Sequence, residues 1–484
     1  MSISTALNAA LSGLTAASRR AEVVSSNVAN AATPGYGRRQ VELASGLVGG
    51  LVPGVSIIGV TRKEDLLLLS QRRGAEAGLA NAQVRADFLN GTEDSIGLPD
   101  EPGSLSDRLS SFETSLIEAA SRPDSEARLL AVAETASRVA EKLNALHDKV
   151  QDERLNADRA IAESVDDLNS ALRQVVNLNA KIIQFSSSTR DTSSLIDARQ
   201  QVIDSIAGLI PVQQVPRDNG AIALFSPGGA MLVDSKAADF GFTGVPMLTV
   251  YMTQAGGGLS GLTINGQDIS TGAENGPISG GRLDALFRIR DEIAPGLQTQ
   301  LDAVARNLIE RFEDVTVDPT LTAGDPGLFT DNGLALDLTE ELGLAGRISL
   351  NALADPDQGG AVWRIRDGLG AAAIGDPGNA SLLNALSAAL ADDVTPGSGV
   401  FSVARDAIGL AGDFLSYVSI GAFAAESQVS YSRAETDALI TAELQDAVDT
   451  DQEMQELLLV EQAYTANARV MASIDEMMQQ ILGL

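Results

Sequence analysis

The chain has 484 residues, of which 44% are hydrophobic and 20% are charged, so its composition is that of a folded protein and its length predicts about three or four domains. Its 65 acidic residues exceed its 34 basic residues, and the formal net charge of −31 would repel a nucleic acid or an anionic membrane surface. The absence of cysteine excludes disulfides, zinc-thiolate sites, iron–sulfur clusters and a thiol nucleophile.

The first residues lack the basic and apolar regions of a secretory signal peptide, so none is predicted. We also find no stretch of the ~18 apolar residues that a membrane span requires. The single histidine, His147, lies within a long helical pattern, where we interpret it as a solvated or packed side chain rather than as a metal ligand or base. These facts alone would place the protein in the cytoplasm.

A helix is predicted from Ser2 to about Asn30, because apolar and small residues recur alternately four and three positions apart. This is the spacing of a coiled-coil seam, which buries itself against a partner helix. The seam consists of Ile3, Leu7, Ala10, Leu14, Ala17, Ala21, Val24 and Val28. Its larger members are candidate assembly residues, namely Ile3, Leu7, Leu14, Val24 and Val28.

The first helix must end near Ala32, because residues 33–36 read Thr-Pro-Gly-Tyr, the pattern of a type II turn in which Gly35 adopts a positive φ. The candidate turn motif comprises Asn30, Thr33, Pro34, Gly35 and Tyr36. We expect this turn to set the angle between the first helix and the rest of the chain, whereas alanine at Arg39, expected to be exposed, should cost little. The alternative is a loop that tolerates change.

An extended stretch follows the turn, through Val41, Leu47, Val52, Val55, Ile57 and Val60. The helical pattern returns from Arg62 to about Phe88. Between Pro123 and Pro211 there is no proline, and apolar residues recur at helical spacing. A helix of ~60 residues would span about 90 Å, which predicts a rod-shaped helical domain.

Residues 211–280 contain glycine, proline and short β-branched runs, which predict a small β subdomain. Within it, residues 256–261 match G-x-G-x-x-G, but a strand and a turn follow rather than the helix that a dinucleotide site requires, so we interpret the match as a hairpin loop. Helix is predicted again over 281–313 and 401–447. The segment 314–400, rich in Gly, Pro and Asp, predicts an irregular insertion.

The last helix carries a second seam of the same spacing. Thr450 and Glu453 fit a capping box at its start, and its acidic character complements the arginines near the first helix. The candidate assembly residues on this seam are Leu457, Val460, Tyr464, Met471, Ile474, Met478 and Ile481. Each terminal helix is too amphipathic to be stable alone, so each buries its stripe against the other or against a neighbouring subunit. The alternative is two ordinary core helices at the chain ends.

The predicted fold class is mainly α with β insertions, that is, terminal coiled-coil-like helices, a rod of long helices and one or more small β-rich subdomains. The predicted domains are 1–45 with 448–484 (terminal helices and turn), 46–210, 281–313 and 401–447 (helical rod), 211–280 (β-rich subdomain) and 314–400 (outer insertion).

No phosphate-binding loop, zinc-protease motif or nucleophile elbow occurs in the sequence. Carboxylates are so abundant that a pair at glycosidase spacing would be uninformative. We therefore predict no catalytic residue, no cofactor and no metal.

Residues 26–36, Ser-Asn-Val-Ala-Asn-Ala-Ala-Thr-Pro-Gly-Tyr, closely resemble the signature near the start of flagellar rod, hook and hook-associated proteins. The long helices that follow are similar to those of the hook-associated protein 1 family. Further similar segments lie at residues 178–182, 195–199, 280–283, 287–290 and 461–470. The resemblance spans both termini and the helical body, and it is loose over 314–400.

The resemblance implies a structural protein of the flagellum that joins hook to filament and catalyses nothing. It implies export through the flagellar type III apparatus without a cleaved signal, an extracellular location, and assembly as a ring whose inner tube is built by the terminal helices. The implied partners are other copies of the chain, hook protein, hook-associated protein 3 and an export chaperone on the C-terminal helix. The competing hypotheses are another axial protein, such as hook-associated protein 3, flagellin or hook protein, and a flagellum-associated glycan hydrolase.

Overall fold

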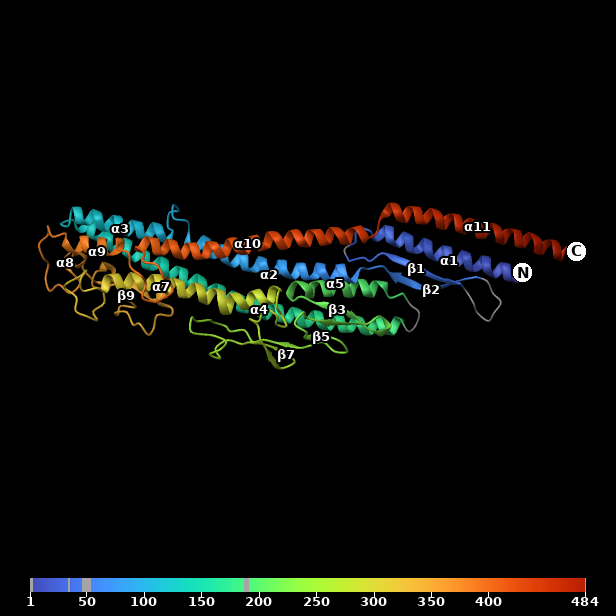
Figure 1. Cartoon of the computed structure of the whole chain (residues 1–484), viewed down its shortest axis with the longest axis horizontal. Helices are drawn as coiled ribbons and strands as arrows, with labels where there is room; N and C mark the ends of the chain where they lie inside the picture. The colour runs from blue at the N-terminus through green and yellow to red at the C-terminus, as the bar shows by residue number, and fades with distance from the viewer. Residues whose placement is uncertain (1–2, 34, 46–53, 187–190, 484) are drawn as a thin grey trace.

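The computed structural model describes residues 3–33, 35–45, 54–186 and 191–483, and within them the chain is 61% helical with four small antiparallel sheets (Figure 1). The fold class is therefore the predicted one, mainly α with β insertions. The α-helices are α1 (Ile3–Asn30), α2 (Leu66–Ile96), α3 (Leu105–Ser121), α4 (Glu126–Ser186), α5 (Ser193–Leu209), α6 (Arg282–Arg288), α7 (Ala294–Glu313), α8 (Trp363–Asp367), α9 (Ser381–Ala391), α10 (Ala407–Asp446) and α11 (Thr450–Leu482).

The strands are short and pair only with antiparallel neighbours. They are β1 (Arg39–Ser45) with β2 (Val55–Arg62); β3 (Gln213–Pro216), β4 (Ile222–Phe225) and β5 (Met231–Val233); β6 (Phe240–Gly241), β7 (Leu262–Ile264) and β8 (Gln267–Ile269); and β9 (Phe329–Asp331) with β10 (Ile348–Leu350). The 3-10 helices are η1 (Asp218–Gly220), η3 (Leu344–Gly346) and η4 (Pro356–Gln358), and a π-helical segment, η2 (Ile289–Ile293), joins α6 to α7.

The backbone of the rod is α4, whose 61 residues extend about 90 Å. The sequence predicted this helix, and the structure confirms it. One face of α4 is mostly apolar and is buried by the helices around it: α3, α5 and α7 pack on α4, while α2 packs along α10. The chain runs out along the rod and returns, so both termini lie at the same end of an elongated molecule (Figure 1).

The β-rich region lies against α4 and is fixed to it by buried polar side chains. Asn169 of α4 donates to the carbonyl of Phe240 at 2.8 Å and accepts from its amide at 2.9 Å. The fully buried pair Asp158 and Arg290 joins α4 to η2 at 2.7 Å. Residues 256–261 form turns that lead into β7 and no helix follows them, so the glycine-rich motif is a loop, as predicted.

The outer insertion packs on the far end of the rod. Asp302 of α7 accepts hydrogen bonds from the amides of Gly343 and Ala345 at 2.7 and 2.9 Å, and burial raises the pKa of Asp302 to about 6. His147 of α4 packs against Gly346 and burial lowers its pKa, so it is the packed side chain that we expected. The segment is less irregular than predicted, because it contains β9, β10, α8 and α9.

Three predictions about helix starts were wrong. The helix expected from Arg62 to about Phe88 runs instead from Leu66 to Ile96, because Arg62 still belongs to β2 and Asp65 caps the helix. The helix expected from Phe401 begins at Ala407, where the Asp406 side chain caps it by accepting from the amide of Gly409. The capping box expected at Thr450 is absent: the cap is Asp449, which accepts from the amides of Asp451 and Gln452. Glu453 instead points into a buried cluster that the next section describes.

Three phenylalanine rings connect the outer insertion to the rod. Phe112 of α3, Phe312 of α7 and Phe329 of β9 are all buried, with centroids 5.4 to 6.0 Å apart. The insertion therefore shares the hydrophobic core of the rod, and it should not unfold independently of it.

We expect Phe329→Ala to lower the free energy of unfolding of the whole rod by about 3–5 kcal/mol, because it leaves a cavity in the shared core. The matched control is Leu334→Ala on the exposed surface of the same insertion, which should change stability by less than about 0.5 kcal/mol. Chemical denaturation followed by circular dichroism measures both. A stable rod in the Phe329→Ala protein, with only the insertion disordered, would contradict the shared core.

Candidate assembly surface and hinge

The two terminal helices lie side by side beyond the end of the rod (Figure 1). They are antiparallel: Arg20 of α1 forms an ion pair with Glu456, whereas Gly13, two turns earlier, lies against Asn467 further along α11. A Cβ atom at Gly13 would lie 2.7 Å from Oδ1 of Asn467, so glycine allows the helices to approach closely there.

The structure brings much of the predicted seam together. Val24, Val460 and Ile474 are buried, and the half-buried members are Ile3, Leu7, Leu14, Val28, Leu457 and Met471. The buried alanines Ala10 and Ala17 also lie on this seam. The exposed members are Tyr464, Met478 and Ile481. The role of these residues in assembly remains a prediction.

The last helix exposes a second set of apolar side chains that α1 does not cover. These are Met454, Leu458, Leu459, Val470 and Met477. Several exposed large apolar side chains on one helix of a protein of net charge −31 are typical of an interaction site rather than of a solvated face.

The terminal pair is held at its base by one buried amide, that of Asn27. Its Nδ2 donates to the carbonyl of Arg39 at 2.9 Å and to Oε2 of Glu453 at 3.0 Å. Its Oδ1 accepts from the amide of Arg39 at 3.0 Å and from the hydroxyl of Tyr36 at 2.9 Å. All the hydrogen-bonding capacity of the side chain is therefore used, and it fixes α1, β1 and α11 relative to one another.

Glu453 supplies the buried charge of this cluster. Its side chain is almost inaccessible, and its Oε1 accepts from Nε of Arg38 at 2.7 Å. A buried carboxylate is tolerated only when it is paired and hydrogen-bonded, and here Arg38 and Asn27 satisfy it together. We did not predict this role from the sequence. A usable signal was the acidic Glu453 at a position of the apolar seam, together with the two adjacent arginines Arg38 and Arg39 after the first helix.

Asp197 of α5 connects the same region to the rod. It accepts from Arg39 at 2.8 Å and from Arg62 at 3.0 Å, so it holds both strands of the β1–β2 hairpin. Arg39 also lies over the ring of Tyr36, with its guanidinium 4.7 Å from the centroid. The expectation that Arg39 is exposed was therefore wrong. We call Asn27, Tyr36, Arg38, Arg39, Arg62, Asp197 and Glu453 the hinge cluster.

The turn motif lies directly before the hinge cluster. Gly35 has φ +77°, as predicted, and the amide of Tyr36 donates to the carbonyl of Thr33 at 3.2 Å. The side chain of Asn30, the last residue of α1, donates to the carbonyl of Ser26 at 2.9 Å. The predicted role of Pro34, like the strand positions Leu47 and Val52, lies outside the described residues.

Three family models match the chain. The FlgK helical domain of flagellar hook-associated proteins matches residues 93–328, the flagellar basal body rod protein matches 7–36, and the C-terminal region of the flagellar basal body rod proteins FlgEFG matches 446–484. Flagellar hook-associated protein 1 of Bacillus subtilis is 26% identical over 508 residues, an alignment that covers 98% of this chain and 97% of that protein. The chain is therefore similar to flagellar hook-associated protein 1 over nearly its whole length, and its helical body matches the FlgK helical domain.

Alignments with enterobacterial members of the family are shorter. Hook-associated protein 1 of Salmonella typhimurium is 28% identical, and that of Escherichia coli 24% identical, over 243 residues. Each alignment covers 49% of this chain and 44% of the relative, so it spans less than half the length of those proteins. The flagellar hook junction protein FlgK of Burkholderia pseudomallei aligns with a TM-score of 0.44 and 18% identity, over 55% of this chain and 47% of that one.

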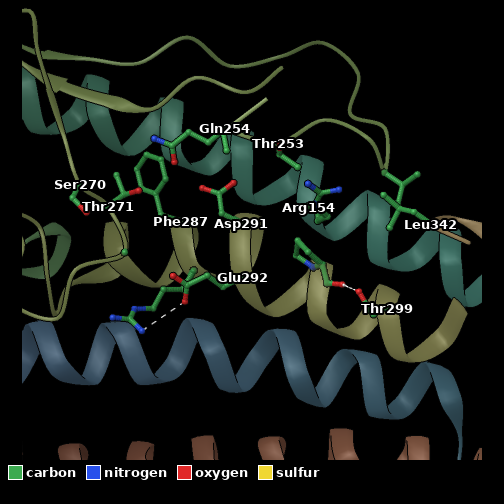
Figure 2. Close-up of a pocket in the computed structure, with 15 residues that line it drawn as sticks. Arg154, Thr253, Gln254, Ser270, Thr271, Phe287, Asp291, Glu292, Thr299 and Leu342 are labelled. Atoms are coloured by element: carbon green, nitrogen blue, oxygen red, sulfur yellow. Dashed lines mark hydrogen bonds and ion pairs between the residues drawn. The ribbon is translucent and has the colours of Figure 1, made fainter. Parts of the chain in front are cut away.

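A cavity of about 450 Å³ lies between α4, the turns before β7 and the η2–α7 segment, and Figure 2 shows the side chains that line it. Its two carboxylates are engaged in ion pairs. Asp291 accepts two hydrogen bonds from Arg290 at 2.9 Å each, and Glu292 lies 3.8 Å from Arg288. In the described part of the chain, no group of three potential ligands is placed to hold a metal. Both ion pairs lie within the continuous α6–η2 helix.

We expect Asn27→Ala to release the terminal helices from the rod. The substitution leaves the carboxylate of Glu453 and the backbone of Arg39 short of partners, at a cost of about 1–3 kcal/mol for each buried group left unsatisfied. Amide hydrogen exchange should become faster in α1 and α11 and stay unchanged in α4. The control is Asn30→Ala on the same helix, whose side chain makes fewer bonds and should have a smaller effect. Equal exchange in the two variants would contradict this account of Asn27.

Gly35→Ala should strain the turn by about 1 kcal/mol or more, because alanine disfavours φ +77° and its Cβ would lie 3.0 Å from Cγ of Gln201. Gly59→Ala is the control, since a Cβ there meets no atom within 4 Å. We expect Gly35→Ala to keep the helical circular dichroism and melting of the rod but to impair filament attachment. Normal filaments in that strain would mean that the turn is a tolerant loop.

Proposed function

We propose that this protein is a structural component of the bacterial flagellum that joins the hook to the filament. Similarity to the hook-associated protein 1 family supports this function, and so does the placement of the terminal helices. The observation that carries the proposal is the terminal pair itself: two paired helices protrude beyond the rod, are fixed at their base by the hinge cluster, and leave apolar surface exposed.

The exposed apolar surface of the terminal pair is what an assembling subunit requires. One face of α11 packs on α1, and a second face with Leu459, Val470 and Met477 meets only solvent in the single chain. Covering such side chains contributes roughly 25 cal/mol for each Å² of apolar surface removed from water. Neighbouring subunits would supply that cover, and the chain termini would then lie in the inner tube of the axial structure.

Members of this family are part of the flagellum, outside the cell, and they assemble with other axial components. For this chain we infer the finer points from the resemblance: export through the flagellar type III apparatus without a cleaved signal, a ring of subunits, and hook protein and hook-associated protein 3 as neighbours. An export chaperone would bind α11, whose amphipathic surface is the kind that a groove accepts.

The hook-associated protein 1 family is structural rather than enzymatic. The buried polar groups of the hinge cluster satisfy one another, and the carboxylates of the cavity in Figure 2 are paired with arginines. The glycan hydrolase hypothesis required two carboxylates of different character in a concave site, and no observation favours it.

We expect the double substitution Leu457→Asp and Met471→Asp to abolish filament attachment, because it places two charges on the half-buried face of α11. Electron microscopy of the mutant strain should show hooks that lack filaments. The volume-conserving variant Leu457→Met with Met471→Leu keeps the apolar seam and should form normal flagella. Filaments of normal length on the aspartate variant would reject assembly through this face.

A further inference from the structure

The helix α10 carries two seams of coiled-coil spacing on opposite faces. The inner seam is buried along α2 and consists of Leu415, Val418, Ala422, Ala425, Val429, Ser432 and Thr436. The outer seam alternates three and four positions in the same way, and all its members are exposed: Tyr417, Ile420, Ala424, Ser427, Tyr431, Ala434, Ala438 and Thr441. A helix that is apolar on both faces is expected to be covered on both.

The outer seam is unusual for the surface of this protein, because it contains no charged residue although the chain has a net charge of −31. Ile420 is 70% exposed and Phe423, beside the seam, is 77% exposed. An 18-residue window within Ala407–Ile481 has a mean hydropathy of 1.4 and only 39% of it is buried. By length and composition that window could cross a membrane, so our expectation that no stretch is apolar enough for a membrane span was wrong. The inner seam of α10 nevertheless packs on α2, as a helix of the rod does.

The spacing of the outer seam indicates what covers it. A repeat of 3.5 residues is the pattern by which one helix accepts the side chains of another, so the occupant is a helix. Two copies of so acidic a chain repel each other wherever their surfaces carry charge, and the uncharged outer seam is where they can approach. In addition, α10 leads through Ala447–Asp449 into α11, so copies brought together by their terminal helices would also have α10 alongside a neighbour.

We propose that the outer seam of α10 is a lateral contact between copies of this chain, packed against a helix of the neighbouring rod. The proposal rests on the proposed function, which brings the copies side by side. Subunits arranged around one axis all have the same orientation. The outer seam of one subunit therefore contacts a different surface of the next subunit, so the contact is heterologous. The rods thereby hold one another, in addition to the packing of the terminal helices.

The test places the photoreactive residue p-benzoylphenylalanine at Phe423 of the full chain, in cells that carry assembled flagella. An aromatic replaces an aromatic at an exposed site, so folding is preserved. Illumination should give a covalent dimer that contains only this chain, with the second attachment point on a helix of the rod. Adding Ile420→Glu and Tyr431→Glu should reduce the dimer at least ~10-fold, which corresponds to 1.4 kcal/mol, with unchanged melting.

Arg433→Glu is the matched control, because it also changes the net charge by two units on the exposed surface of α10 but lies off the outer seam. It should leave the dimer in place. No adduct, an adduct with lipid or another protein, or a dimer that the two glutamates do not reduce would overturn the inference. If the inference fails in one of these ways but filaments stay attached to the hooks, the proposed function is unaffected. Failure of the proposed function would instead appear as normal filaments on the Leu457→Asp, Met471→Asp strain.

Discussion

The direction of the terminal helices depends on one buried hydrogen-bonded amide, that of Asn27. It is 1% exposed and makes four hydrogen bonds, to the main chain of Arg39, to Glu453 and to Tyr36. It joins the end of the first helix and the first strand, which are close in the sequence, to the start of the last helix, which is 426 positions away. A buried carboxylate such as Glu453 contributes little net stability, since its desolvation offsets its pairing with Arg38. We infer that it contributes specificity of position instead.

This constraint separates two requirements of an axial subunit. The rod needs a stable core of its own, and α4 provides it through a long apolar face shared by the neighbouring helices and by the phenylalanine rings that hold the outer insertion. The terminal helices need exposed apolar surface that neighbouring subunits can cover. That surface stays exposed in the single chain because the terminal helices extend beyond the rod. The hinge cluster joins these parts through Asp197, so the direction of the terminal pair is fixed by polar contacts rather than by the core.

The sequence predicted the elements that follow from periodicity. The terminal helices, the helix of about 60 residues and the glycine turn at Gly35 were all recognisable, because helical repeats and backbone restrictions are local. The polar contacts were not recognisable. Thr450 looked like a helix cap and Glu453 like its partner, whereas Asp449 caps the helix and Glu453 pairs with Arg38 across the molecule. Local patterns cannot reveal a partner that is distant in the sequence: Glu453 is 415 positions from Arg38, and Asp197, which pairs with Arg39, is 158 positions from it.

The central claim is that this chain is the structural junction between hook and filament, and deletion of its gene tests that claim most directly. Electron microscopy of the deletion strain should show hooks of normal length without filaments, with flagellin released into the medium, and the intact gene should restore filaments. The account would be contradicted if filaments remained attached to the hooks of the deletion strain, or if the hooks themselves were missing.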